Sequence, residues 1–159
     1  MAEIDLERLI LIIAGVQLKA ELGDRPLAYR IETEMRSQLA TLLPRGDTAA
    51  LPKLAPVVVS DVFYLNNEDL HDRPLVSVGG PGMNMVSANL VEELPTALAI
   101  ENVLVIQMDL EMKDQRCAVW GMDHLSTVRA VETFLVKGYL ESFIRGVVQG
   151  LPQEDAAGD

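Results

Sequence analysis

Short apolar runs that end at turn residues recur along the chain and predict the strands of a sheet. The first run, Leu9–Ala14, is rich in branched residues and stops at Gly15. That pattern favours a strand buried on both faces. A helix that begins near Asp5 is the competing interpretation, because periodicity alone does not separate the two.

Four later runs have the same character and are expected in the same sheet. A second strand is predicted at residues 57–59 and continues past Ser60 and Asp61 through residues 62–65. The third is at residues 75–78. The last two, at residues 103–108 and 117–120, are separated by a polar stretch that suits an antiparallel pair as well as two independently placed strands.

Amphipathic segments between these runs predict helices. Asp24 is expected to cap the first helix and Pro26 to lie in its first turn, after a loop-like polar stretch at residues 17–25. The apolar faces recur at helical spacing. The three predicted faces contain Leu27, Ile31, Met35, Leu39 and Leu42; Met83, Val86, Leu90, Val91 and Leu94; and Leu125, Val128, Val131, Leu135 and Phe143.

The order of these elements is β-α-β-β-α-β-β-α. It predicts an α/β protein, a three-layer sandwich with a mixed, Rossmann-like sheet of about five strands flanked by helices. We expect one domain over residues 1–151, with residues 44–56 as a surface loop. Residues 152–159 are expected to be a disordered acidic tail.

Charge and composition narrow the function classes. The formal net charge is −11 and 49% of the residues are hydrophobic, which argues for a packed globule and against nucleic acid or an anionic membrane as partner. The single cysteine, Cys117, excludes an internal disulfide. The sequence shows no signal peptide and no apolar run long enough to span a bilayer, so a soluble cytoplasmic protein is expected.

The glycine-rich turn at residues 79–84 is the strongest candidate for a binding site. It joins a buried strand to a helix, and its glycines permit positive φ and close approach of a ligand. The turn is neither the dinucleotide fingerprint nor a phosphate-binding P-loop. Its functional interpretation is a cradle for an anion or small ligand, and its structural interpretation is a tight turn in which Asn84 satisfies nearby backbone groups.

The second half of the chain resembles a module of archaeal surface-layer proteins. The resemblance rests on Val78-Gly79-Gly80-Pro81 followed by Asn84, and on Trp120-Gly121 followed by Thr127 and Ala130. That module has a GGP-x-x-N turn and a later glycine followed by a T-x-x-A helix. The resemblance implies the local strand-turn-helix geometry and no catalytic residues.

Polar residues that follow the predicted strands are expected to share one edge of the sheet. The backbone of the glycine-rich turn would face an anion, the guanidinium of Arg25 would balance its charge, and two asparagines would orient it. We predict no metal and name no cofactor. The predicted ligand-binding residues are Arg25, Asn66, Gly79, Gly80, Gly82 and Asn84.

The leading hypothesis is therefore a protein that binds a small polar or phosphate-bearing ligand at the glycine-rich turn. A hydrolase or metal-assisted phosphotransfer enzyme is the first alternative, with Ser60, Asp61, Asp123 and His124 as catalytic candidates. The competing roles are a strand-end turn for Asp61 and a helix cap for Asp123. A self-association module is the second alternative, and a homodimer through the last helix or an edge strand is expected.

Overall fold

A six-stranded mixed sheet forms the centre of the computed structural model, which describes residues 5–42, 54–101 and 103–150. The strand order is β2-β1-β3-β6-β5-β4, with β2, β1, β3 and β6 parallel and the last two antiparallel to their neighbours. The strands are β1 (Leu9–Ala14), β2 (Ala55–Ser60), β3 (Leu75–Val78), β4 (Thr96–Ile100), β5 (Leu104–Met108) and β6 (Arg116–Gly121).

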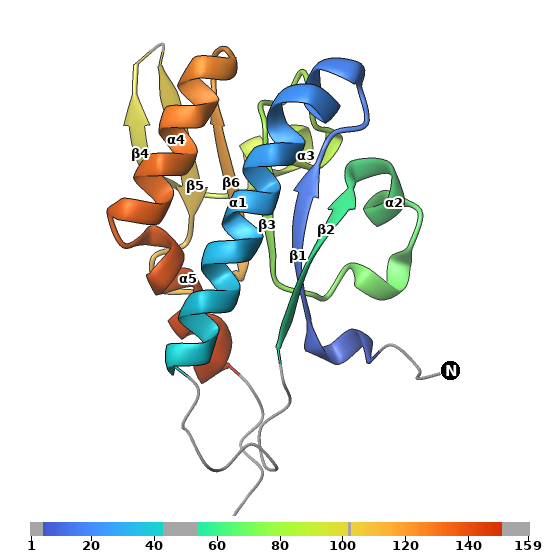
Figure 1. Ribbon diagram of the computed structural model, residues 1–159, viewed down its shortest axis with the longest axis vertical. Helices are drawn as coiled ribbons and strands as arrows, with labels where there is room; N and C mark the ends of the chain where they lie inside the picture. The colour runs from blue at the N-terminus through green and yellow to red at the C-terminus, as the bar shows by residue number, and fades with distance from the viewer. Residues whose placement is uncertain (1–4, 43–53, 102, 151–159) are drawn as a thin grey trace, which may run out of the picture.

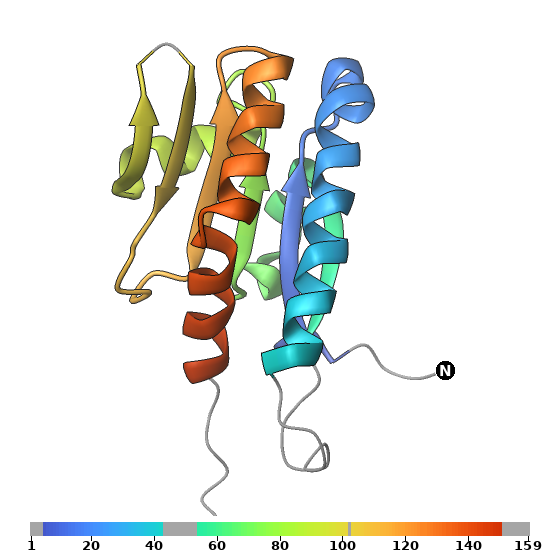
Figure 2. The same cartoon turned by 60° about the vertical axis from the view of Figure 1, so that its left-hand side comes forward.

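Helices cover both faces of this sheet, as the sandwich prediction requires (Figure 1). Helices α1, α4 and α5 lie on one face, where α1 runs beside the α4–α5 pair (Figure 2). Helices α2 and α3 lie on the other face. The helices are α1 (Leu18–Leu42), α2 (Asp61–Leu65), α3 (Met85–Glu93), α4 (His124–Val136) and α5 (Tyr139–Gln149), with short 3₁₀ helices at Leu6–Arg8 and Glu68–Leu70.

The position of strand β1 in the sheet explains why its sequence is continuously apolar. It lies between β2 and β3, so its side chains alternate into two separate cores. Ile10 and Ile12 pack under α1, whereas Leu11 and Ile13 pack under α2 and α3. Both faces are therefore apolar, and the strand interpretation of Leu9–Ala14 is confirmed over the helical one.

All five predicted strand cores lie in the sheet, and β5 and β6 form the antiparallel pair. The sixth strand, β4, was not predicted. It follows Pro95 directly, occupies the edge of the sheet and leaves Ile100 47% exposed, so it has no continuous buried run to mark it.

The start of α1 differs from the prediction. The helix begins at Leu18 and contains Pro26 in its interior, so Asp24 is an interior helical residue and not a cap. Ala20, Asp24 and Leu27 lie on the buried stripe of this helix. Packing of that stripe against the sheet outweighs the backbone hydrogen bond that a proline in the helix removes.

Two further boundaries were predicted wrongly. Residues 61–65 form helix α2 and not a continuation of β2, because the Ser60 hydroxyl accepts a hydrogen bond from the Phe63 N–H at 3.0 Å and caps the helix. The last predicted helix is two helices, since Gly138 has a φ of +86° between α4 and α5.

The predicted loop at residues 44–56 lies mostly, and the predicted tail entirely, outside the described residues. Among the described helices, none is long and apolar enough to cross a membrane.

Candidate functional site

The carboxyl ends of the parallel strands meet at one edge of the sheet, at the top of Figure 1. The chain turns in opposite directions from β1 and from β3, and ligands bind beside such points in open α/β sheets. A pocket of about 550 Å³ opens at this edge, between the first turns of α1, the turn after β3 and the start of α4. We call it the glycine-turn pocket. Its lining residues are Lys19, Asp24, Gly80, Pro81, Gly82, Met83, Trp120, Gly121, Met122, Asp123, His124 and Thr127.

Asn84 fills the gap between β1 and β3 and ties three elements together. Its amide nitrogen donates to the Ile13 and Val78 carbonyls, each at 3.0 Å. Its side-chain oxygen accepts from the Val86 and Ser87 N–H groups at 2.9 and 3.2 Å and so caps α3. The side chain is 1% exposed, and these bonds occupy the polar groups that a ligand would need. This is the structural role weighed for Asn84, and Asn84 does not line the pocket.

The turn itself is held close to the neighbouring elements. A β-carbon on Gly15 would collide with the Met83 carbonyl oxygen, so the turn folds directly over the end of β1. Gly79 has a φ of +108°, which L side chains rarely adopt. Gly82, in contrast, has no described atom within 4 Å of its β-carbon position and faces open space.

Asp24 is the most unusual group in the glycine-turn pocket. Its side chain is 6% exposed, and no residue that the structure describes donates a hydrogen bond to it. The β-carbon position of Gly79 lies 2.5 Å from Asp24 Oδ2, so the carboxylate occupies space left by that glycine. Burial raises the pKa of the Asp24 carboxyl to about 6, and the His124 ring opposes that rise. Buried polar groups are normally partnered. The Asp24 oxygens are not among the fully enclosed side-chain atoms without a partner, because the carboxylate lines the pocket.

His124 reaches the same pocket from the first turn of α4. Its ring packs on Gly23, whose β-carbon position is 2.8 Å from His124 Nδ1. A side chain on Gly23 would displace the ring. Gly23 therefore leaves room for the His124 ring, and Gly79 leaves room for the Asp24 carboxylate. Each contact joins two residues that are far apart in the sequence.

Apolar side chains make up much of the remaining wall. Trp120, Pro81, Met83 and Met122 line it, and the Trp120 ring lies 3.5 Å from the β-carbon position of Gly80. Lys19 lines the pocket from an exposed position on the first turn of α1. The pocket therefore has a buried carboxyl, apolar walls and a polar rim that carries Lys19, Asp123 and His124.

The predicted ligand-binding residues separate into two groups. Gly80 and Gly82 line the pocket and Gly79 backs onto Asp24, so the glycine-rich turn does belong to it. The Arg25 guanidinium does not line the pocket; it pairs with Glu21 at 3.4 Å and lies over the Tyr29 ring. Asn66 is the exposed C-cap residue of α2 and also lies outside the pocket.

The four catalytic candidates are not brought together. Ser60 caps α2, as described above. Asp61 is buried and its carboxylate accepts from the Met85 N–H at 2.9 Å and the Val62 N–H at 2.8 Å. Asp123 caps α4 by accepting from the Ser126 N–H at 2.8 Å, and this bond lowers the pKa of its exposed carboxyl. Of the four, only Asp123 and His124 line the glycine-turn pocket.

The described part of the chain contains no cluster of metal ligands. There, no group of three or more His, Cys, Asp and Glu side chains is placed to hold a metal ion. Cys117 is fully buried in β6, and that burial raises the pKa of its thiol far above its usual range. The thiol therefore has little nucleophilic character at neutral pH.

Asp24 is the site residue that the sequence prediction missed. The polar stretch at residues 17–25 resembles a loop that ends in a cap. The available signal was its spacing, because Asp24 lies four residues after Ala20 and three before Leu27, on the stripe that faces the sheet.

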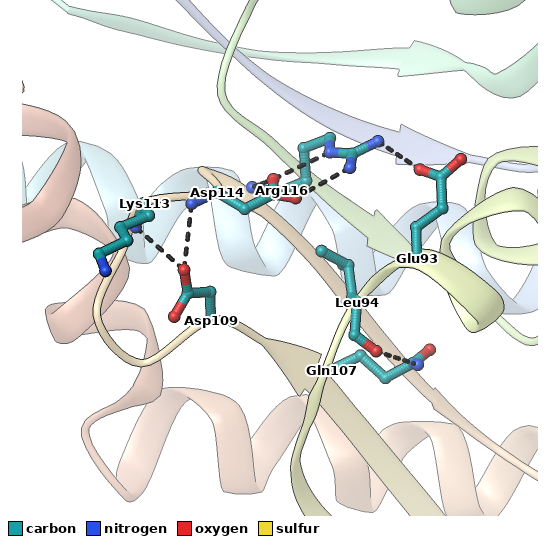
Figure 3. Close-up of polar contacts among 7 residues, drawn as sticks. All are labelled: Glu93, Leu94, Gln107, Asp109, Lys113, Asp114 and Arg116. Atoms are coloured by element: carbon teal, nitrogen blue, oxygen red, sulfur yellow. Dashed lines mark hydrogen bonds and ion pairs between the residues drawn. The ribbon is translucent and has the colours of Figure 1, made fainter.

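A second polar cluster lies at the opposite end of the parallel strands, where β6 begins (Figure 3). Arg116 contacts Asp114 at 2.8 Å and Glu93 at 2.7 Å, and the hydrogen bonds from Arg116 lower the pKa of the Asp114 carboxyl. Gln107 donates to the Val91 and Leu94 carbonyls and fixes the end of α3. The charges of Arg116, Asp114 and Glu93 satisfy one another, so these three residues form a structural network. The side-chain oxygen of Gln107 is buried and has no hydrogen-bond partner among the described residues.

Comparison with protein-family models gives no match, and no curated protein matches the chain in sequence.

Proposed function

We propose that this protein binds a small polar ligand in the glycine-turn pocket. The observation that carries the proposal is Asp24, a carboxyl that is more than nine-tenths buried, lines the pocket and accepts no hydrogen bond from any described residue. Leaving such a group unpaired costs stability, and proteins accept that cost most often where a ligand or ordered water completes the pairing.

The walls support the same proposal. The volume of about 550 Å³ is in the range typical of small-molecule pockets, which combine apolar walls with a few placed polar groups. The position, at the carboxyl ends of parallel strands, is where ligands bind in this class of sheet. The hydrolase alternative loses support because Ser60 and Asp61 are engaged in capping and backbone bonds outside the pocket.

A thermal-shift screen of a metabolite library against the wild type and Asp24→Asn tests this function. We expect at least one compound to raise the melting temperature of the wild type and to have a smaller effect on Asp24→Asn. Asp69→Asn, which changes an exposed carboxylate outside the pocket, is the matched control and should keep the full response. Compounds that stabilise all three proteins equally would contradict a site at Asp24.

A further inference from the structure

The chemistry of the glycine-turn pocket also selects among ligand classes. We infer that the ligand presents N–H donors from a flat amidine, guanidine or amino-heterocycle head to Asp24, and that it is not held by a phosphate group. This inference rests on the proposed function, because it concerns the same pocket.

The charges at the buried end of the pocket carry the first step. The group there is an acceptor: the Asp24 carboxylate, with two oxygens and no donor from the described residues. A phosphate placed against it would bring like charges together in a buried site. The arginine expected to offset such an anion is paired with Glu21 outside the pocket.

The remaining polar groups of the pocket lining do not reverse this preference. The Trp120 indole N–H has no partner among the described residues, but its nitrogen is buried and closed to solvent. Asp123 adds a second carboxylate at the rim, where it is engaged as a helix cap. The Thr127 hydroxyl donates to the Asp123 carbonyl at 2.9 Å and accepts from the Gly121 N–H at 3.1 Å. The Lys19 and His124 side chains are exposed, so they lie at the open side of the pocket, where water screens electrostatic interactions.

Shape carries the second step. A carboxylate accepts two parallel N–H bonds from an amidine or guanidine head, which is the strongest arrangement available to a single carboxylate. The aromatic ring of Trp120, with Pro81 and Met83, gives the pocket apolar surface against which a flat ring can pack. A flat head with paired N–H donors uses both features.

Benzamidine, benzamide and benzoate test this inference, because they share one ring and differ in the charge and donors of the head group. We expect benzamidine at pH 7.5 to shift the amide NMR signals of Gly23, Gly79 and Gly80, benzamide to bind more weakly, and benzoate and inorganic phosphate to leave these signals unchanged. Asp24→Asn should weaken benzamidine binding about tenfold or more, and Asp69→Asn should not.

A pH series on the wild type gives a second readout. Protonation of Asp24 removes the acceptor, so benzamidine should bind roughly tenfold more weakly at pH 5 than at pH 7.5, given a pKa of about 6. The other charged or titratable side chains that line the pocket are Lys19, Asp123 and His124, and His124 is the one that acts on Asp24 electrostatically. The pH dependence should therefore persist in His124→Gln and disappear in Asp24→Asn.

Binding of benzoate or phosphate at the same amides, with an affinity equal to that of benzamidine, would overturn the inference and leave the proposed function standing. A failure of benzamidine to shift these signals would also overturn it. The proposed function fails separately, when the metabolite screen gives no compound whose effect depends on Asp24.

Discussion

The carboxylate of Asp24 occupies the space that a β-carbon on Gly79 would need, with 2.5 Å between that position and Asp24 Oδ2. One residue lies within α1 and the other follows β3, so this contact joins two elements that the chain separates widely. It places a titratable group against the glycine-rich turn and explains why the turn contains glycine at this position.

Replacing Gly79 with alanine tests that contact. We expect the free energy of unfolding to fall by about 2–4 kcal/mol, because a φ of +108° strains alanine and its β-carbon would displace Asp24. Urea unfolding measures the loss. In an Asp24→Ala background the substitution should cost less, since only the backbone strain remains. Equal costs in both backgrounds would show that the two side chains do not compete for space.

The pH dependence of stability should report Asp24 directly. Its folded pKa of about 6 lies above the ordinary aspartate value of 3.8, so the folded state binds the proton more tightly than the unfolded state. Stability from this group is therefore full below about pH 4 and is lost as the pH rises through about 6. The loss is on the order of 2–3 kcal/mol.

Urea unfolding of the wild type and Asp24→Asn between pH 4 and pH 7.5 measures this loss. The difference in stability between the two proteins should change across that window in favour of the variant as the pH rises. A constant difference would contradict a raised pKa at Asp24.

Asn84 is predicted to be a structural residue. Asn84→Asp keeps the oxygen that caps α3 but loses both amide donors and places a carboxylate against the Ile13 and Val78 carbonyls. We expect a loss of about 2–4 kcal/mol in the free energy of unfolding. Asn66→Asp, at the exposed end of α2, should change stability by no more than about 0.5 kcal/mol. Comparable effects of the two substitutions would contradict the assigned role.

Gly121 and Gly82 form a matched pair within the pocket lining. A β-carbon on Gly121 would collide with Ser126 and lie 2.6 Å from the Thr127 backbone nitrogen, whereas one on Gly82 meets no described atom within 4 Å. Gly121→Ala should therefore cost about 1–3 kcal/mol or more, and Gly82→Ala should be within about 0.5 kcal/mol of the wild type. Thermal unfolding of both variants gives the comparison.

The sheet was predictable because burial on both faces leaves a continuous apolar run, as at Leu9–Ala14. Strand β4 was not, since an exposed edge strand lacks that signal. The start of α1 was missed because Pro26 and its polar neighbours resemble the beginning of a helix. The helix begins earlier, at Leu18, because Ala20 as well as Leu27 packs in the core.

The candidate site was predictable only in part. The glycine-rich turn can be recognised from its composition, and its residues Gly80 and Gly82 line the pocket. Arg25 and Asp24 are neighbours, however, and which of the two faces the sheet depends on where the helix begins. Once α1 includes Ala20, helical spacing places Asp24 inward and Arg25 on the surface beside Glu21.

The homodimer stays a prediction, and the structure narrows where to test it. The two edge strands of the sheet, β2 and β4, differ in how well they are protected. Strand β2 contains Pro56, whose carbonyl accepts a hydrogen bond from Arg36. Strand β4 (Thr96–Ile100) contains neither a proline nor a charged residue. We therefore expect association through β4. Light scattering should give a dimer for the wild type and a monomer for Leu98→Lys, and a wild-type monomer at high concentration would contradict association.

The proposed ligand site depends on Asp24 being a buried carboxyl that lines the glycine-turn pocket and accepts no hydrogen bond from the described residues. The most direct test is a carbon-13 NMR titration of the aspartate carboxyl groups, with Asp24→Asn used to assign the Asp24 signal. We predict a titration midpoint near pH 6 for Asp24. A midpoint near 4, as for an exposed aspartate, would contradict the burial of Asp24 and the account of the pocket built on it.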